Sequence, residues 1–269
     1  MVLNISSVAF NLGPLEIHWY AIFIIFGMIL GTSIASLEAK REGLSTSNIF
    51  DFVLYALPLS ILGARIYYVI FNFSEYCDHP SEIFAVWHGG LAIYGGLITG
   101  IICLFIFCKK RKLPIFLFLD VGSPSVLLAQ AIGRWGNFTN QEAYGLETTQ
   151  HFLSSTLHLP TFIVKGMEIQ GVYYQPTFLY ESVWNFLGFF LILCLRHRKN
   201  IYLEGEIFWQ YVAWYSLGRF FIEGLRTDSL MIFGDFRISQ ILSIIFLFLA
   251  IIFVAIRRKK KDIPLYSKL

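Results

Sequence analysis

A polar, glycine-rich stretch at residues 133–145 carries the side chains of this chain that are best suited to chemistry. It reads Gly-Arg-Trp-Gly-Asn-Phe-Thr-Asn-Gln-Glu-Ala-Tyr-Gly and follows a strongly apolar segment. Its glycines would let backbone N–H groups approach an anion, and Arg134 offers a planar set of donors suited to phosphate or carboxylate. Asn137 and Asn140 can each donate and accept hydrogen bonds. Because Gly and Asn are also common in turns, a solvated loop is the alternative interpretation.

A second group of charged residues lies in the segment 215–228. Tyr215, Arg219 and Glu223 are spaced four residues apart, so they share one face of a helix, and Arg226 follows one turn later. Charged side chains within a membrane span normally face the bundle interior and mark a site or a pathway. A structural ion pair between Arg219 and Glu223 is the alternative, although burying two charges is costly.

Three further candidates lie in or beside apolar segments. Arg65 would be costly inside a membrane unless it is paired or hydrated, but it could also extend its guanidinium to the membrane surface. Glu181 stands near the start of an apolar segment, where it could accept hydrogen bonds from an arginine or cap a helix. Tyr20 follows Trp19 at a position where aromatic residues often serve only as interface anchors.

The composition of the chain is that of a membrane protein. Of 269 residues, 56% are hydrophobic and 14% are charged, and the mean hydropathy is +0.63. We predict an all-α polytopic membrane protein that forms a single transmembrane domain over residues 1–269. Seven apolar segments are long enough to cross about 30 Å of hydrocarbon: 17–37, 50–72, 91–108, 114–132, 178–195, 206–224 and 238–256. The amino end lacks a basic start and a small-residue cleavage site, so no removable signal peptide is expected.

The positions of Lys and Arg predict the orientation of these segments. Basic clusters follow the first, third and fifth segments and fill the carboxyl tail, so the positive-inside rule places the carboxyl end in the cytoplasm and the amino end outside. Residues 146–175 would then form an outer arm, with a hairpin around Lys165 and Gly166. The basic residues set topology, so the net charge of +3 does not indicate a nucleic-acid partner.

The charged candidates come from separate parts of the sequence but map to the outer half of the predicted membrane. They are Arg65, Arg134, Glu142, Glu181, Arg219, Glu223 and Arg226. A cavity with arginines at headgroup depth and apolar walls suits a glycerophospholipid, because guanidinium binds phosphate and apolar grooves accept acyl chains. The four cysteines and six histidines show no metal-ligand spacing, so we predict no metal site.

The chain resembles the bacterial phosphatidylglycerol:prolipoprotein diacylglyceryl transferases from near Gly13 to the final apolar segment. Residues 133–145 look like the family signature G-R-x-G-N-F-x-N-x-E-x-[WY]-G. The supporting blocks are residues 18–20, 63–67, 89–96, 176–181 and 215–228. Seven spans with the amino end outside also agree with this family.

The resemblance implies a reaction on the outer face of the bacterial cytoplasmic (inner) membrane. The diacylglyceryl group of phosphatidylglycerol would pass to the lipobox cysteine of a prolipoprotein signal peptide, with release of glycerol phosphate. The family uses no metal or organic cofactor, and a monomer is expected. By resemblance, Arg134 and Arg219 face the phosphate. We assign catalysis to Arg134, Arg219, Glu223 and Glu142, and substrate binding to Tyr20, Arg65, His88, Tyr94, Asn137, Asn140, Gly145, Glu181, Tyr215 and Arg226.

The sequence departs from the family pattern at two positions. Tyr94 stands where some members have a histidine that has been considered the base, and Gln175 stands where a histidine often precedes the proline. A neutral tyrosine is a poor base at pH 7 because its pKa is about 10. The residue that accepts the thiol proton is therefore not assigned, and the candidates are Glu223, Glu142 and His88. Alternatively, the positive field of the arginines alone lowers the pKa of the thiol.

Two other classes of function are alternatives. A transporter or channel should show polar residues that continue to the inner face, and many transporters contain an internal repeat. Here Asp120 is the exception in otherwise apolar inner halves, and no repeat is found. A non-catalytic scaffold that binds lipoproteins would not need several arginines at headgroup depth.

Overall fold

The computed structural model describes residues 6–13, 15–77, 79–227, 231–232, 236–260 and 262–266. The chain divides into two compact units. Unit 1 comprises Met1–Ile34 and Leu119–Leu269, and unit 2 comprises Ala35–Phe118. Asp228, which ends one of the blocks of resemblance, lies outside the described residues. The backbone of His88 is described but its side chain is not.

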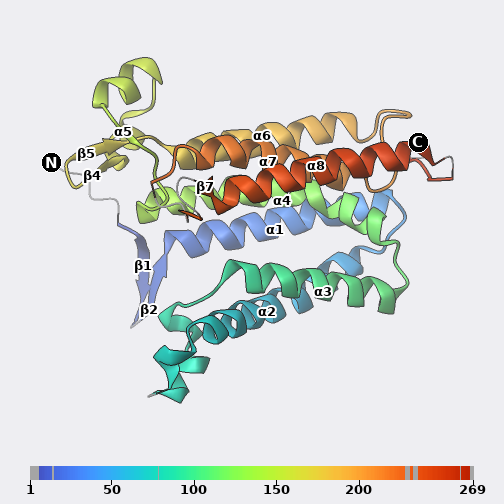
Figure 1. Ribbon diagram of the computed structural model, residues 1–269, viewed down its shortest axis with the longest axis horizontal. Helices are drawn as coiled ribbons and strands as arrows, with labels where there is room; N and C mark the ends of the chain where they lie inside the picture. The colour runs from blue at the N-terminus through green and yellow to red at the C-terminus, as the bar shows by residue number, and fades with distance from the viewer. Residues whose placement is uncertain are drawn as a thin grey trace. The chain divides into compact units, whose positions relative to one another are not determined.

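Long helices make up most of the described chain (Figure 1). Their bounds are α1 Trp19–Arg41, α2 Thr46–Phe71, α3 Ile93–Arg111, α4 Ile115–Asn140, α6 Thr177–Leu195, α7 Glu206–Glu223 and α8 Ile238–Lys259. Among the described residues, six of these, all but α7, are long and apolar enough to cross a membrane. α7 is more polar because it carries Glu206, Arg219 and Glu223. The prediction of a mostly helical, polytopic membrane protein is confirmed.

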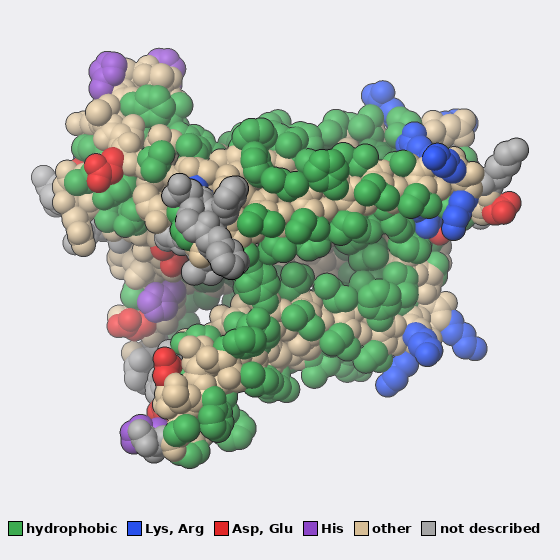
Figure 2. All heavy atoms as spheres, in the orientation of Figure 1, with side chains coloured by type: hydrophobic (Ala, Val, Ile, Leu, Met, Phe, Trp, Pro, Cys, Tyr) green, Lys and Arg blue, Asp and Glu red, His purple; other side chains and the backbone are tan. Residues whose placement is uncertain are grey.

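The surfaces of these helices suit a lipid environment. Large apolar side chains of α8 point outward, among them Phe248, Ile251 and Ile252, which are 51–59% exposed. Figure 2 shows hydrophobic side chains along the helices of each unit, while Lys and Arg side chains gather at helix ends. In unit 1 such an end is the carboxyl end of α8, where Arg257, Arg258 and Lys259 follow one another.

Small residues allow close helix packing in unit 1, as is usual in membranes. A Cβ atom on Gly27 of α1 would lie 3.3 Å from the Cα of Ala129 on α4, and one on Gly31 would lie 3.1 Å from the carbonyl oxygen of Ser125. α6, α7 and α8 then pack in sequence order, α6 on α7 and α7 on α8. α4, α6 and α7 together bring the candidate residues of unit 1 to one end of these helices.

Asp120 of α4 fixes the start of α7. Its fully buried carboxylate accepts hydrogen bonds from the backbone N–H groups of Gly205 and Phe208, the second over 2.8 Å. The first N–H groups of a helix lack partners within the helix, and its N-terminus favours negative charge. Asp120 was the one residue that favoured a polar path to the inner face. In the structure it caps α7 instead.

The arm is a small structure with its own core. It contains β3 Glu147–Thr148, a π-helical turn η4 at Phe152–Thr156, α5 Thr161–Gly166, β4 Glu168–Ile169 and β5 Val172–Tyr174. The strands form an antiparallel sheet in the order β3-β5-β4. Ile163, Val164 and Met167 of this region pack with Phe138 of α4 and Phe178 of α6, which ties the arm to those helices.

The hairpin predicted around Lys165 and Gly166 is wrong. These residues end α5, and the hairpin joins β4 to β5 at Gln170 and Gly171, whose φ angles are 52° and 83°. A short apolar run fits a buried helix as well as a strand, so the pattern alone could not decide between them.

Two further hairpins lie in unit 1: β1 Val8–Leu12 with β2 Leu15–His18, and β6 Met231–Ile232 with β7 Phe236–Arg237.

Unit 2 is built on the packing of α2 against α3. A Cβ atom on Gly95 of α3 would lie 2.5 Å from the carbonyl oxygen of Gly63 on α2. The glycine pair Gly95–Gly96 therefore serves close helix packing. Three 3-10 turns connect these helices: η1 Phe73–Tyr76, η2 Pro80–Phe84 and η3 Val86–His88.

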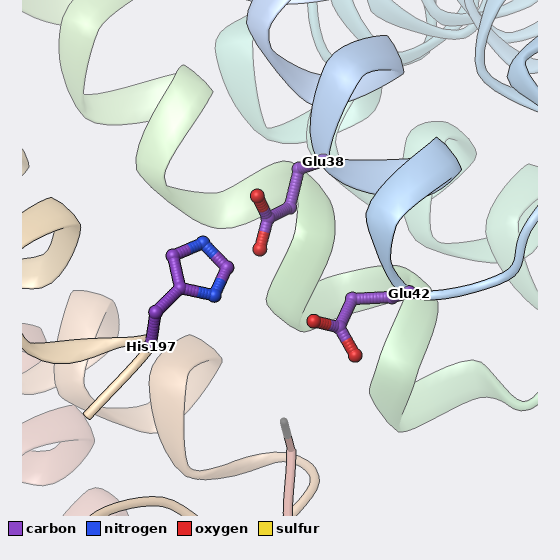
Figure 3. Close-up of side chains that lie close together, drawn as sticks. All are labelled: Glu38, Glu42 and His197. Atoms are coloured by element: carbon purple, nitrogen blue, oxygen red, sulfur yellow. The ribbon is translucent and has the colours of Figure 1, made fainter. Parts of the chain in front are cut away.

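The last turns of α1 belong to unit 2 and carry Glu38. Figure 3 shows its carboxylate and that of Glu42, which directly follows the helix. Glu38 is buried, and its carboxylate lies 3.9 Å from the guanidinium of Arg41. His197, also drawn there, follows α6 in unit 1.

Candidate active site

Glu181 of α6 lies between two arginines from two other helices. Its carboxylate is 2.5 Å from the guanidinium of Arg134 on α4 and 3.3 Å from that of Arg219 on α7. The Glu181 side chain is only 4% exposed, whereas those of Arg134 and Arg219 are 21% and 17% exposed. One buried carboxylate therefore holds two partly accessible guanidiniums together.

The ionic contacts continue on both sides of this centre. Arg219 pairs with Glu223 over 2.6 Å, and Arg134 donates to the side-chain carbonyl of Asn137 over 3.2 Å. The amide of Asn137 donates in turn to the carboxylate of Glu142 over 2.8 Å. A continuous chain of polar contacts thus links Glu223 to Glu142. We call these six residues, Glu142, Asn137, Arg134, Glu181, Arg219 and Glu223, the polar chain.

The local structure of the signature explains the first half of the polar chain. Residues up to Asn140 are helical, so α4 extends eight residues beyond the predicted segment 114–132. The loop interpretation is wrong for residues 133–140, and their backbone N–H groups belong to the helix instead of facing an anion. Arg134 and Asn137 point the same way because three residues make almost one turn. A turn with positive φ at Gln141 (51°) and Ala143 (57°) then brings Glu142 back to Asn137.

Two tyrosines lie at this site. The charged neighbours of the Tyr215 hydroxyl are Glu181, Arg134 and Arg219, as its place one turn before Arg219 on the same face predicts. Tyr20 of α1 lies against α4: a Cβ atom on Gly136 would lie 2.5 Å from the Tyr20 ring. This glycine serves the close approach of an aromatic ring.

Three more predicted residues lie where the arm joins α4 and α7. Gly145 forms an isolated antiparallel bridge with Arg226, and its N–H donates to the carbonyl of Gln175 over 2.9 Å. A Cβ atom on Gly145 would lie 2.9 Å from the Cβ of Gln175, so the chain segments cross too closely for a side chain. Asn140 is exposed at the end of α4. Close packing explains why residue 145 is a glycine. Contacts of Arg226 and Asn140 with a substrate stay predictions.

The arm covers the Glu142 end of the polar chain. The side-chain amide of Gln141 donates to the carbonyl of Gly166 at the end of α5 over 3.1 Å. Asn137, Glu142 and Met167 line a cavity of about 10 Å³ beneath the arm, roughly the space that one water molecule requires. Access to Glu142 in this structure is therefore from its exposed side.

The remaining predicted residues, Arg65, Tyr94 and His88, belong to unit 2. Arg65 is buried and donates to the carbonyl oxygens of Glu82, Ile83, Gly89 and Gly90 over 2.5–2.9 Å. These contacts satisfy a buried guanidinium and hold the turns between α2 and α3. Tyr94 lies at the start of α3 and is 39% exposed. Binding of substrate by these three residues stays a prediction.

Sequence reasoning missed one arginine beside the site. The guanidinium of Arg237, just before α8, donates to the backbone carbonyl of Glu223, and Gln240 donates to the carbonyl of Phe220 over 3.0 Å. The last carbonyls of a helix lack partners within it, and its C-terminus favours positive charge. Arg237 therefore holds the end of α7. Its position directly before the last apolar segment was the available signal.

Comparison with known proteins decides the family. The family model described as prolipoprotein diacylglyceryl transferase matches residues 7–256. The chain belongs to this family. A phosphatidylglycerol–prolipoprotein diacylglyceryl transferase of Enterococcus faecalis is 52% identical over 268 residues, which cover 100% of this chain and 96% of the relative. Proteins of the same name from Lactobacillus acidophilus and Streptococcus uberis are 54% and 51% identical over 258 and 264 residues. These alignments cover 96% and 98% of this chain, and 91% and 100% of the relatives.

The resemblance inferred from the signature is thus confirmed. The reaction of this family requires certain chemical properties of the polar chain. A diacylglyceryl transferase of this kind must bind an anionic lipid headgroup and bring a second substrate to it. Each guanidinium has five N–H donors in a fixed plane. The contacts with Glu181 orient Arg134 and Arg219, and their partial exposure leaves both accessible to an anion.

Proposed function

We propose that this chain transfers the diacylglyceryl group of phosphatidylglycerol to the lipobox cysteine thiol of a prolipoprotein. The thiol sulfur forms a bond to the glycerol carbon of the diacylglyceryl group, the bond from that carbon to the phosphate oxygen breaks, and glycerol phosphate leaves. The observation that carries this proposal is the meeting of Arg134 and Arg219 on the Glu181 carboxylate.

The two arginines stabilise the leaving group. Negative charge grows on the phosphate oxygen as the carbon–oxygen bond breaks, and donors that are already oriented stabilise such charge most effectively. Arg134 and Arg219 carry like charges and would repel one another without Glu181 between them. Glu181 therefore keeps both guanidiniums within reach of one phosphate. Tyr215 adds a hydroxyl among the same groups.

Glu142 is the carboxylate best placed to accept the thiol proton. Glu181 and Glu223 are each paired with a guanidinium and are almost fully buried, so their oxygens are already engaged and offer a thiol little access. Glu142 is exposed, and its hydrogen bond comes from the neutral amide of Asn137. A free thiol has a pKa of about 8.5, so the positive field of the arginines must assist the transfer to a carboxylate.

α7 supplies the seventh span, and the site faces the outer leaflet of the cytoplasmic membrane. Arg237, directly before α8, contacts Glu223 in the polar chain, and the other end of α8 carries Arg257, Arg258 and Lys259. By the positive-inside rule that basic end is cytoplasmic, so the site lies at the opposite, outer end. The polarity of α7 is compatible with this, because its charges face partners on α6 and α8 instead of lipid.

The test is modification of a lipobox peptide by membranes that contain this protein and phosphatidylglycerol. Mass spectrometry should detect the added diacylglyceryl group, and Arg134→Ala and Arg219→Ala should abolish it. Arg198→Ala is the control, since Arg198 is an exposed arginine after α6, and it should retain normal activity. Normal modification by both site variants would refute the assignment of the site. No modification by the unaltered protein would refute the function.

A further inference from the structure

Trp184 on α6 and Trp214 on α7 form a reciprocal pair. The indole N–H of Trp184 donates to the backbone carbonyl of Trp214, and the indole N–H of Trp214 donates to the backbone carbonyl of Trp184, each over 2.9 Å. The two rings are stacked, with centroids 4.4 Å apart and an interplanar angle of 17°. Each helix thus makes the same contact with the other, as in a two-fold symmetric interface.

A glycine four residues after each tryptophan makes room for this contact. A Cβ atom on Gly188 would lie 2.4 Å from the ring of Trp214, and one on Gly218 would lie 2.2 Å from the ring of Trp184. The side chain of residue i+4 lies above residue i on a helix. Glycine at this position therefore leaves each tryptophan carbonyl open to the indole of the other helix.

This contact fixes α6 against α7 along their length. A helix rises 1.5 Å per residue. Sliding α6 along α7 by one residue would therefore break both indole hydrogen bonds, and each ring would meet a side chain beside Gly188 or Gly218 where it now meets the glycine. Ion pairs between long, flexible side chains tolerate such a shift. In lipid, close packing and hydrogen bonds between helices determine how they associate, because apolar side chains gain little by leaving the lipid.

The pair lies beside the polar chain on both helices. Glu181 comes one turn before Trp184 on α6, and Arg219 directly follows Gly218 on α7. On the other side of α6, the Ser182 hydroxyl donates to the carbonyl of Ala131 on α4 over 2.9 Å. α6 is therefore fixed to α4 at the residue next to Glu181, and to α7 one turn further along.

We infer that Trp184 and Trp214 are positioning residues for the transferase site, an inference that rests on the proposed function. They set α6 against α7 so that the Glu181 carboxylate lies between Arg134 and Arg219. They act through the spacing of these two guanidiniums. Binding of the anionic donor lipid should therefore depend on them.

The first test replaces each tryptophan by phenylalanine, which keeps a ring but removes the indole N–H. Trp184→Phe and Trp214→Phe should each lower kcat/KM for phosphatidylglycerol about tenfold, a typical effect of one lost buried hydrogen bond. Trp209→Phe is the matched control. Trp209 lies on α7 and contacts Phe253 at a tilted angle of 32°, with ring centroids 4.6 Å apart, and its indole N–H has no hydrogen-bond partner among the described residues. An equal loss in the control would overturn the inference.

A double-mutant cycle separates positioning from general weakening of the fold. If Trp214 acts through Glu181, Trp214→Phe should change kcat/KM less than about twofold once Glu181→Gln is present, because groups that act through one another are not additive. A merely structural role predicts the same fold loss in both backgrounds, and that result would overturn the inference. Activity of the unaltered protein in the same assay shows whether the proposed function itself holds.

A rescue experiment covers variants that fold poorly. Gly218→Ala places a methyl group on the Trp184 ring and should abolish most activity, whereas adding Trp184→Ala, which removes that ring, should restore activity to the level of Trp184→Ala alone. The amount of protein in the membrane, measured by immunoblot, normalises each rate. A double variant no more active than Gly218→Ala would contradict the inference.

Discussion

The carboxylate of Glu181 lies 2.5 Å from the guanidinium of Arg134, although 47 residues separate them in the chain. The same carboxylate reaches Arg219 on a third helix over 3.3 Å. Three helices thus share one buried anion, which allows two cations to stay close together. A phosphate that approaches from the accessible side meets both guanidiniums in a fixed orientation, and this arrangement suits the release of a phosphate leaving group.

Glu181→Gln should impair the use of the donor lipid. The amide keeps the shape of the side chain but removes the charge that holds two guanidiniums together, and breaking a buried ion pair typically costs about 3–5 kcal/mol. Because both arginines are partly exposed, we expect a smaller effect, a loss of ~30-fold in kcat/KM for phosphatidylglycerol, or about 2 kcal/mol.

The control for this charge removal is Glu168→Gln. Glu168 is an exposed carboxylate in the arm that accepts a hydrogen bond from Tyr173 over 3.0 Å. This variant should retain the kcat/KM of the unaltered protein. Equal rates for Glu181→Gln and the unaltered protein would show that Glu181 does not organise the arginines.

Two glycines of one signature should respond in opposite ways to alanine. Gly136→Ala should reduce activity and thermal stability, because its Cβ atom would lie 2.5 Å from the ring of Tyr20. Gly133→Ala should be tolerated or stabilising, since a Cβ atom there meets nothing within 4 Å and alanine favours a helix by about 0.5–1 kcal/mol. Thermal unfolding in detergent and the peptide assay measure both effects. A harmful Gly133→Ala would indicate a contact that the packing does not explain.

Glu142→Gln should produce a loss of rate that depends on pH. Without a proton acceptor, the enzyme must use the fraction of thiol that is already ionised, which rises about tenfold per pH unit below a pKa of ~8.5. The ratio of unaltered to variant kcat should therefore be largest near pH 6 and shrink toward pH 9, while KM for the lipid stays constant. A ratio that is constant over this range would argue against Glu142 as the base.

Asp120→Ala should destabilise the protein without altering its substrate preference. Asp120 caps α7 through Gly205 and Phe208, and loss of a helix cap costs about 0.5–2 kcal/mol. Thermal unfolding of the purified protein should show a lower midpoint. Asp51→Ala, which removes a more exposed ion pair with Arg111, should have a smaller effect on the midpoint. An unchanged midpoint for Asp120→Ala would mean that the cap contributes little.

The sequence by itself determined the membrane character, the family and the residues that share one helical face. Hydropathy located the long helices within a few residues, except at the carboxyl end of α4, because the requirement for about 30 Å of apolar length is local. The four-residue spacing of Tyr215, Arg219 and Glu223 likewise fixed their common face, since helix geometry depends only on neighbouring residues.

Only the tertiary structure decided the partners of these residues. Sequence spacing could not tell whether Glu181 caps a helix or binds an arginine, because its partners come from α4 and α7. Gly and Asn suggested a loop at residues 133–140, yet packing against Tyr20 and the arm keeps them helical. The pairing of Trp184 with Trp214 depends on the positions of two helices. Such contacts join residues far apart in sequence, and only the packed bundle brings them together.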